Sequence, residues 1–241
     1  MQRIATYGFF VFEGCNGSGK TTVMNAVAER LRKQCGEDKI VTITNPTKGP
    51  VGVEARRFIS EAKSRGEVPR FFSSNHETMG FATRLALLFM ADRIAAQYAI
   101  SEAAAQDKIV LCDRYGLSTL IYQCAMVGDV SLSGDLASVV KTVHDTAGFH
   151  IPEITFVLDA PVSVLRARLR ARGETMDDLM MTDVEPAVRS MYLDFAKRNR
   201  DGDGGYASAI ASQVDVVNVD ERVEVVAGDI ARRIRSTEIA F

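Results

Sequence analysis

The stretch Gly14-Cys15-Asn16-Gly17-Ser18-Gly19-Lys20-Thr21 decides how the chain folds. It fits the pattern G-x-x-x-x-G-K-[ST], in which glycines let successive backbone N–H groups curl around a phosphate. It follows an apolar run at residues 7–12 and opens a helical pattern at residues 20–34, which is the strand–loop–helix context that the pattern needs. The helix N-terminus adds a partial positive charge. The sequence therefore predicts a phosphate-binding loop on the first strand of a sheet.

Two side chains of this loop carry most of its expected chemistry. Lys20 is expected to reach the β- and γ-phosphates of a nucleoside triphosphate, and Thr21 to hold a Mg²⁺ ion. The strand predicted at residues 109–112 ends in Asp113, a carboxylate suited to organise the same Mg²⁺ through its water shell. A glycine turn without a ligand is the alternative. The residues expected to contact the triphosphate are Gly14, Cys15, Asn16, Gly17, Ser18, Gly19, Lys20, Thr21 and Thr22.

Short apolar runs alternate with longer helical patterns along the rest of the chain. The further predicted strands are residues 39–44, 109–112, 154–158 and 214–219. The further predicted helices are residues 51–63, 77–106, 116–124, 133–144, 161–172, 184–198 and 221–235. Strands that are apolar on successive residues are typical of a parallel sheet covered on both faces. We therefore expect one α/β domain over residues 1–241, with a five-stranded parallel sheet in a three-layer sandwich.

Composition narrows the classes of function. The chain has 241 residues, 46% hydrophobic, with 29 Lys and Arg against 31 Asp and Glu and a net charge of −2. It has no basic excess for nucleic acid or a membrane surface, and no apolar stretch near the ~20 residues of a spanning helix. We expect a soluble protein without a targeting segment. The four cysteines form no C-x-x-C pair, which favours reduced thiols and a cytoplasmic location over disulfides or zinc: Cys15, Cys35, Cys112 and Cys124.

A cluster of arginines predicts a lid over residues 166–183. Arg168 and Arg172 share one face of a helix because they are four residues apart, and Arg170 projects to one side of them. Such arginines stabilise the charge of a phosphoryl group in transfer, so Arg168 and Arg172 are candidate catalytic residues and Arg170 a candidate nucleotide contact. Alternatively, these arginines simply favour the helix dipole and solvate one face.

Taken together, several segments of the sequence resemble the thymidylate kinase family of nucleoside monophosphate kinases. The specific blocks are Leu87-Leu88-Phe89 with Asp92-Arg93, and Asp113-Arg114-Tyr115 with Ser118 and Tyr122-Gln123. The matching segments are residues 10–14, 45–52, 87–93, 113–123 and 155–159, in the family's order. The resemblance implies a three-layer P-loop kinase fold, a homodimer, ATP and Mg²⁺ as cofactors, and phosphorylation of dTMP to dTDP in deoxynucleotide biosynthesis.

The same resemblance implies a binding site for the acceptor nucleotide. Phe89 would stack on the pyrimidine, and Arg93, on the same helical face, would donate to its O4. Arg114 would grip the acceptor phosphate and act in catalysis with Lys20. Tyr122 would pack under the deoxyribose and disfavour a 2′-hydroxyl. The base edge would be lined by Ser118, Thr119 and Gln123.

Three positions depart from the family's pattern. Asn16 replaces a carboxylate that accepts from the sugar 3′-hydroxyl; its amide oxygen still accepts, but without charge. Thr44-Asn45-Pro46 replaces Arg-Glu-Pro, which leaves Lys48 or Arg56 as candidates for the missing contact to the acceptor phosphate. The lid carries Met176-Asp177 in place of an Asp-Arg pair.

These departures keep other functions open. A kinase for another 5-substituted deoxyuridylate, or a broader deoxynucleotide kinase, would use the same residues. A nucleotide-sensing binding protein without useful turnover is an alternative from another class, which the intact Lys20, Thr21, Asp113 and Arg114 disfavour. A signalling GTPase is disfavoured because the chain has no Asn-Lys-x-Asp motif.

Overall fold

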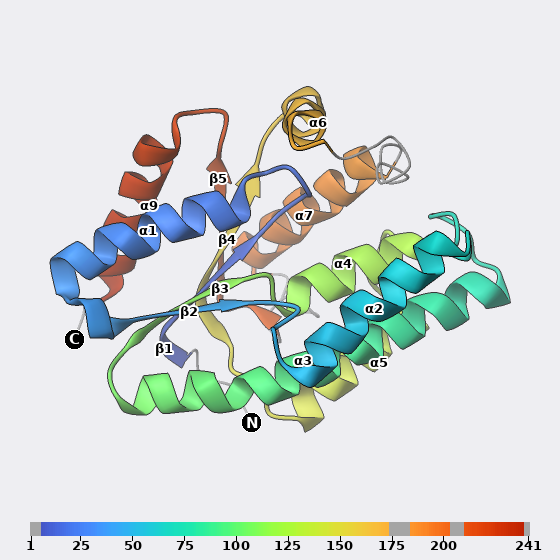
Figure 1. The fold of residues 1–241 in the computed structure, drawn as a ribbon, viewed down its shortest axis with the longest axis horizontal. Coiled ribbons are helices and arrows are strands. Elements are labelled where there is room, and N and C mark those ends of the chain that lie inside the picture. Colours follow the sequence, from blue (N-terminus) through green and yellow to red (C-terminus); the bar gives the residue numbers. More distant parts are fainter. Residues whose placement is uncertain (1–5, 174–183, 203–209, 239–241) are drawn as a thin grey trace.

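The central strand of the sheet is β1 (Thr6–Glu13), which is apolar without interruption from Phe9 to Phe12. In the computed structural model, which describes residues 6–173, 184–202 and 210–238, its Phe9, Phe10 and Phe12 are fully buried. A strand buried on both faces needs a neighbour on each side and a layer of helices above and below. The sheet provides the neighbours, in the order β2-β3-β1-β4-β5 with every pairing parallel (Figure 1).

The remaining strands are β2 (Ile40–Thr44), β3 (Ile109–Asp113), β4 (Pro152–Asp159) and β5 (Gln213–Asn218). Phe12 pairs with Asp113 of β3 and with Phe156 of β4, so the carboxyl ends of the three central strands lie at one edge. The ring centroids of Phe12 and Phe156 lie 5.6 Å apart, within the range of a favourable aromatic pair.

Helices cover both faces of the sheet. On one face, α1 (Lys20–Cys35) packs against α9 (Val223–Glu238) and the central strands. On the other face, α3 (His76–Ala105) and α7 (Glu185–Arg200) contact the sheet, and α4 (Gly116–Met126) packs between them, with α5 (Asp135–Thr146) against α3 and α4. The helix α6 (Val162–Ala171) stands beyond the carboxyl end of β4 (Figure 1). The predicted three-layer α/β sandwich with five parallel strands is confirmed.

The predicted boundary between the first helix and the second strand needs a small correction. Lys39 lies in a 3₁₀ turn, η1 (Glu37–Lys39), and β2 begins one residue later. The Lys39 N–H donates to the Gly36 carbonyl at 3.3 Å, a local bond that keeps Lys39 out of the sheet. At the other end of the sheet, Asp113 is the last residue of β3 itself.

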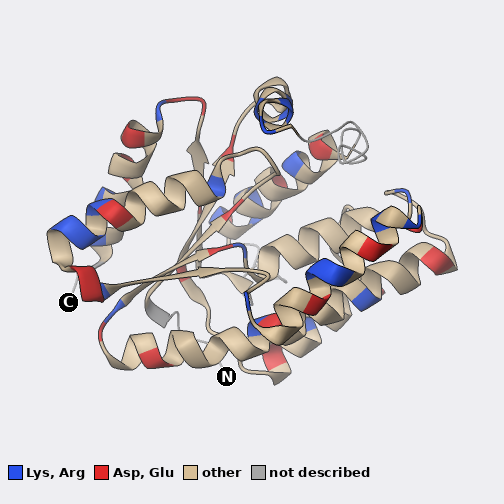
Figure 2. Ribbon diagram, in the orientation of Figure 1, with Lys and Arg blue, Asp and Glu red and all other residues tan. Residues whose placement is uncertain are grey.

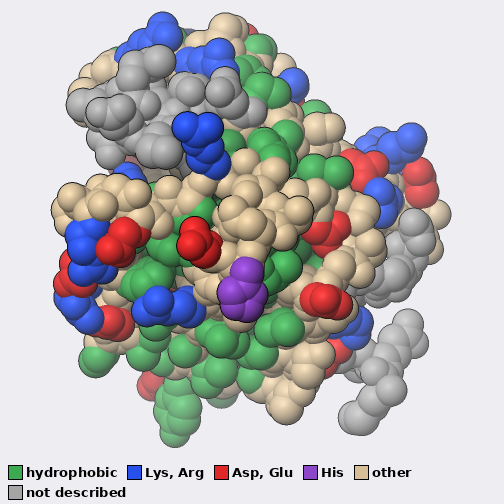
Figure 3. Space-filling model, turned by 90° about the vertical axis from the view of Figure 1, so that its right-hand side faces the viewer, with side chains coloured by type: hydrophobic (Ala, Val, Ile, Leu, Met, Phe, Trp, Pro, Cys, Tyr) green, Lys and Arg blue, Asp and Glu red, His purple; other side chains and the backbone are tan. Residues whose placement is uncertain are grey.

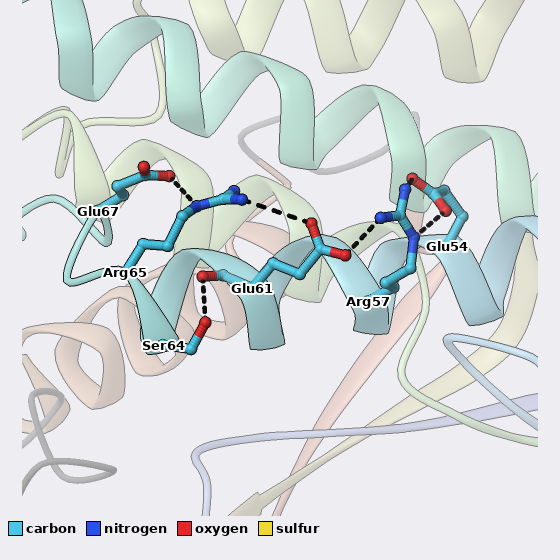
Figure 4. Close-up of polar contacts among 6 residues, drawn as sticks. All are labelled: Glu54, Arg57, Glu61, Ser64, Arg65 and Glu67. Atoms are coloured by element: carbon cyan, nitrogen blue, oxygen red, sulfur yellow. Dashed lines mark hydrogen bonds and ion pairs between the residues drawn. The ribbon is translucent and has the colours of Figure 1, made fainter.

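The helix α2 (Pro50–Ser64) buries few of its side chains. It packs on α3, and its buried residues are small: Gly52, Ala55 and Ala62. Its exposed face carries alternating charges, visible in Figure 2, which form the ladder drawn in Figure 4. The pairs are Arg57 with Glu54 and Glu61, and Arg65 with Glu61 and Glu67. Exposed pairs of this kind add little to stability, so α2 is held mainly by its packing on α3, where the ring centroids of Phe58 and Phe81 lie 5.1 Å apart.

The surface beside this ladder mixes both signs of charge. Figure 3 shows acidic and basic side chains interspersed on one end of the molecule, with hydrophobic side chains along the lower edge of that view. Among the helices that the structure describes, none has both the length and the apolar character needed to cross a membrane.

Candidate functional site

Three acidic residues end the three central strands at the same edge of the sheet. Glu13 ends β1, Asp113 ends β3 and Asp159 ends β4. In parallel α/β sheets, ligands bind just beyond this edge, because the loops and helix N-termini that follow the strands gather there. The predicted phosphate-binding loop follows Glu13 directly.

The phosphate-binding loop is seated tightly between β4 and α6. A Cβ atom at Gly14 would lie 2.4 Å from the Leu158 carbonyl oxygen, and one at Gly17 would lie 2.6 Å from the Leu165 carbonyl oxygen. Both glycines have positive φ, 131° and 82°. No residue with a side chain fits at either position without moving the neighbouring backbone. The loop is therefore fixed in shape by the strand on one side and by α6 on the other.

Lys20 is buried in this loop with its ammonium turned toward the loop's own backbone. Its Nζ donates to the carbonyls of Gly14 at 3.0 Å and Cys15 at 2.8 Å. Burial, with the positive charge of Arg114 nearby, lowers the pKa of Lys20 to about 7. The ammonium is thus placed at the centre of the predicted phosphate cradle.

The two predicted metal ligands lie together at the start of α1. The Thr21 hydroxyl donates to Asp113 Oδ2, and Asp113 is almost completely buried. A hydroxyl and a carboxylate are the hard oxygen donors that Mg²⁺ prefers. Thr22 lies beside them, exposed on the first turn of α1.

Arg114 brings a second group of predicted residues together. Its Nη2 donates to Asn16 Oδ1 at 2.5 Å and its Nη1 to Ser118 Oγ at 2.9 Å. Its Cζ lies 5.3 Å from the centroid of the Tyr122 ring, whose hydroxyl accepts from the Asn16 N–H at 3.1 Å. Because Asn16 and Ser118 are neutral, these hydrogen bonds hold the guanidinium without cancelling its charge.

The backbone of Arg114 is held in an unusual conformation. Its φ is 66°, in the left-handed region that non-glycine residues seldom occupy. Two bonds fix it there: the Arg114 N–H donates to the Phe12 carbonyl at 3.0 Å, and Asn45 Nδ2 donates to the Arg114 carbonyl at 2.8 Å. Backbone strain of about 1–3 kcal/mol persists where the surrounding structure demands it, which is common at functional sites.

A third group surrounds Arg93 on α3. Arg93 is 2% exposed, its Nη1 donates to the Thr119 hydroxyl, and its Nε has no hydrogen-bond partner among the described residues. The half-buried Phe89 lies one turn earlier, with its ring centroid 5.8 Å from the Arg93 Cζ. Gln123 is also buried, and its Oε1 lacks a partner within the same described part. An aromatic face therefore lies near two buried polar atoms whose hydrogen-bonding capacity is unused within the described residues.

The segment after β2 is anchored to α3 by a carboxylate that sequence reasoning left without a role. Asp92 accepts from the Thr47 N–H at 2.7 Å and from the Thr47 hydroxyl at 2.5 Å. Arg56 donates to the carbonyl oxygens of Pro46 and Thr47, so its guanidinium holds the segment in place. Lys48 is exposed. Lys48 and Arg56 were the two predicted substitutes for the family's arginine. The guanidinium of Arg56 is therefore occupied by backbone carbonyls, whereas Lys48 faces solvent.

The predicted lid arginines are spread over different surroundings. Arg168 Nη2 donates to the Val219 carbonyl at 2.7 Å, which draws this side chain toward the end of β5. Arg170 and Arg172 are exposed at the C-terminal end of α6. Arg166 pairs with the buried Glu185 at 3.4 Å. The rest of the predicted lid, including Met176-Asp177, lies outside the described residues.

Sequence reasoning gave no role to several residues that support the site. Glu13 is fully buried and accepts hydrogen bonds from α4 and α7. Asp159 is bound by both Nε and Nη2 of Arg189 on α7, at 2.6 and 2.8 Å. The signal for both was present, because each is an acidic residue that ends an otherwise apolar run. Their partners could not be read from the sequence, since α7 lies far along the chain.

The described structure also has a pocket away from these groups. It has a volume of ≈ 590 Å³ and lies where α2 connects to α3, lined by residues that include Arg70, Phe81 and Arg84. None of the predicted ligand contacts lines it. The chemistry therefore points to the edge of the sheet rather than to this pocket.

Comparisons with known proteins point to one family. Residues 12–202 match the family model described as thymidylate kinase. The thymidylate kinase of Dinoroseobacter shibae is 32% identical over 192 residues, covering 79% of this chain and 83% of that protein. The thymidylate kinase of Geobacter sulfurreducens is 30% identical over 225 residues, covering 93% and 95%. A crystal structure of thymidylate kinase from Ehrlichia chaffeensis aligns with a TM-score of 0.62 at 22% identity, covering 96% of this chain and 100% of that one, and shows the same fold.

Proposed function

The chain belongs to the thymidylate kinase family, and we propose that the three groups around Lys20, Arg114 and Arg93 perform that family's reaction on this chain. The protein is an ATP-dependent phosphotransferase that converts dTMP to dTDP, as the sequence resemblance predicted. The roles of individual residues stay proposals and are argued below from their contacts.

ATP binds at the phosphate loop in this proposal. The backbone N–H groups of the loop and the N-terminus of α1 receive the β-phosphate, and the Lys20 ammonium exchanges its contacts with the Gly14 and Cys15 carbonyls for phosphate oxygens. Arg170 keeps its predicted nucleotide contact and Arg172 its predicted catalytic role in this proposal, supported by their charge and by the seating of α6 on Gly17. Arg168 keeps its predicted catalytic role at a site nearer β5.

The monophosphate acceptor lies opposite ATP, with its phosphate on Arg114. Asn16 and Ser118 aim the guanidinium while leaving it cationic, and Tyr122 packs beside it for the sugar. An acceptor phosphate oxygen is already anionic, so phosphoryl transfer needs positioning and charge neutralisation and no strong general base. Lys20 and Arg114 supply that neutralisation from the two sides of the transfer.

The proposal that the base is thymine rests on the surroundings of Arg93. A buried guanidinium with an unpaired Nε beside an aromatic ring suits a pyrimidine whose 4-position is a carbonyl. Cytosine would place an amine donor against this donor and be rejected. Thr119 and Gln123 line the base edge in this proposal. Ser118 was also predicted there, but its hydroxyl accepts from Arg114, so we assign it mainly to the phosphate side.

Mg²⁺ fits the donor set at the start of α1. Thr21 and Asp113 would hold it, directly or through its water shell. When bound, the ion would screen the negative charge of the triphosphate oxygens.

A homodimer and a cytoplasmic location complete the proposal. Leu87, Ile94 and Tyr98 are exposed along one side of α3, an apolar stripe suited to a second copy. The four cysteines are free, three of them buried, which suits a reducing compartment. Nucleotides are the expected partners.

A coupled ADP-release assay with ATP·Mg²⁺ tests the function. The acceptors are dTMP, dUMP, 5-hydroxymethyl-dUMP, dCMP, dGMP and dAMP, and strong preference for dTMP is expected. Lys20→Ala is the control for the site, with an expected loss of at least about a hundredfold in turnover. Preference for another acceptor would overturn the base assignment, and turnover unaffected by Lys20→Ala would overturn the phosphate-loop assignment.

A further inference from the structure

The buried carboxylate of Glu13 is the least explained charge near the site. Its side chain is fully buried, and no salt-bridge partner contacts it within the described residues. Four donors satisfy it instead. They are the backbone N–H groups of Tyr115 at 2.7 Å and Ser118 at 3.0 Å, the Ser118 hydroxyl, and the Tyr192 hydroxyl at 3.1 Å. A buried carboxylate without a contacting cation costs several kcal/mol in desolvation, which argues for a specific task.

The contacts of Glu13 lead to Arg114 in a single step. The Ser118 hydroxyl donates to Glu13 Oε2 and accepts from Arg114 Nη1 at 2.9 Å. A hydroxyl that donates to a carboxylate is polarised, so it accepts more strongly from the guanidinium. The other carboxylate oxygen accepts from the N–H of Tyr115, the N-cap residue of α4, and from the N–H of Ser118 in its first turn.

We propose that Glu13 is a positioning residue for acceptor binding, acting through the Ser118 hydroxyl to aim the Arg114 guanidinium at the acceptor phosphate. The inference rests on the role given to Arg114 in the proposed function. The proposal also bears on Asn16, which stands where the family has a carboxylate. Asn16 contacts Arg114 with a neutral amide, so the negative charge that orients the guanidinium comes from Glu13, through the Ser118 hydroxyl. Tyr192 supports the carboxylate, since burial and the nearby Glu13 charge raise the pKa of Tyr192 and keep it a neutral donor.

Calorimetric titration of the full-length protein with dTMP and, separately, with the non-hydrolysable ATP analogue AMP-PNP tests the proposal. Glu13→Gln keeps the shape of the side chain but removes the charge that polarises Ser118. We expect the Kd of dTMP to rise about tenfold to a hundredfold, as for losing support of a charged hydrogen bond, while the Kd of AMP-PNP changes less than about threefold. Ser118→Ala should give the same split, and the double variant should be no worse than the poorer single variant, because both break one relay.

Glu153→Gln serves as the matched control. It makes the same change of a carboxylate to an amide at a residue that accepts from the Gly8 N–H at 3.0 Å, outside the site. It should change the Kd of dTMP by less than about threefold.

Several results would overturn the proposal. An unchanged Kd of dTMP in Glu13→Gln, or equal losses for dTMP and AMP-PNP, would make Glu13 a purely structural residue. Additive effects of Glu13→Gln and Ser118→Ala would show separate actions. If Glu13→Gln does not fold, a normal Kd of dTMP in Ser118→Ala refutes the relay alone. Arg114→Lys separates this proposal from the proposed function on which it rests. Normal dTMP affinity in Arg114→Lys would remove the proposed role of Arg114. Normal dTMP affinity in Glu13→Gln alone would refute the role of Glu13 and leave that of Arg114 standing.

Discussion

Lys20 lies buried in the phosphate cradle, and this burial makes its ammonium easy to deprotonate, although the carbonyls of Gly14 and Cys15 accept from it. Burial lowers its pKa to about 7, below the ordinary value for lysine. Bound phosphates favour the ammonium and raise this pKa again. Above pH 7 the free protein therefore holds Lys20 largely neutral, and ATP binding must bring a proton with it.

We predict proton uptake on binding of AMP-PNP that rises from little at pH 6.5 toward one proton at pH 8.5. Calorimetry in buffers of different ionisation enthalpy measures it. Lys20→Arg is the matched control, because its guanidinium stays charged at every pH in this range and its binding should take up no such proton. Equal uptake by the two proteins at pH 8.5 would contradict the assignment.

Arg93 is predicted to act on the acceptor and not on ATP. Arg93→Gln keeps a donor near Thr119 but loses the charge and reach of the guanidinium, so kcat/KM for dTMP should fall about tenfold to a hundredfold. The KM for ATP should change little. Steady-state kinetics with each substrate varied in turn gives the comparison, and equal losses for both substrates would remove the base-recognition role.

Individual residues of the site differ in how far sequence could predict them. The loop residues and Asp113 follow from a motif with fixed spacing, and the structure brings Thr21 and Asp113 into contact as expected. Arg93 and Phe89 meet because four residues make one helical turn. The roles of Glu13 and Asp92 were not predicted, because their partners lie on other elements and spacing along the chain does not reveal such contacts.

At the scale of elements, α2 lies very close to α3 and to the segment after β2 at Gly52. Gly52 lies on α2 where a Cβ would be 2.2 Å from the Thr47 carbonyl oxygen and 2.8 Å from Asp92 Oδ1. Gly80, on α3, has no atom within 4 Å of that position. The same substitution by alanine can therefore be compared at a crowded helical glycine, Gly52, and at an open one, Gly80.

Gly52→Ala should lower stability by roughly 1–3 kcal/mol through overpacking, and weaken dTMP binding by displacing the segment that Asp92 holds. Gly80→Ala should raise stability by about 0.5–1 kcal/mol, because alanine restricts the unfolded chain. Thermal melting of the three proteins measures both effects. A Gly52→Ala protein as stable as wild type would show that α2 moves away from α3 without penalty.

Elements were predicted more completely than contacts between them. The five strands were recoverable because each is a short apolar run ended by polar residues, and buried parallel strands leave that pattern. The 3₁₀ turn at Glu37–Lys39 was missed because a three-residue turn leaves no periodicity. The direction of Arg168 was also beyond the sequence, since its carbonyl partner at Val219 follows a different strand.

For the whole molecule, the exposed stripe on α3 predicts self-association. Tyr98 is 84% exposed, far more than an aromatic side chain without a partner usually is. Tyr98→Glu should convert a homodimer into a monomer, observed by light scattering. Val225→Glu, at a site on α9 with 47% exposure, should leave the mass unchanged. A wild-type protein of monomer mass at micromolar concentration would contradict the prediction.

The strand order has a consequence for how the chain reaches its native state. No two neighbours in the sheet are joined by a hairpin, and the pairing closest in sequence joins Ile154 to Gln213. β1 acquires its second neighbour only when Phe10 meets Ile154. Each pairing must first close a long loop, and such non-local topologies fold slowly and expose unpaired edges meanwhile. On the ribosome, the three phenylalanines of β1 must wait for more than half of the chain to emerge before they are covered.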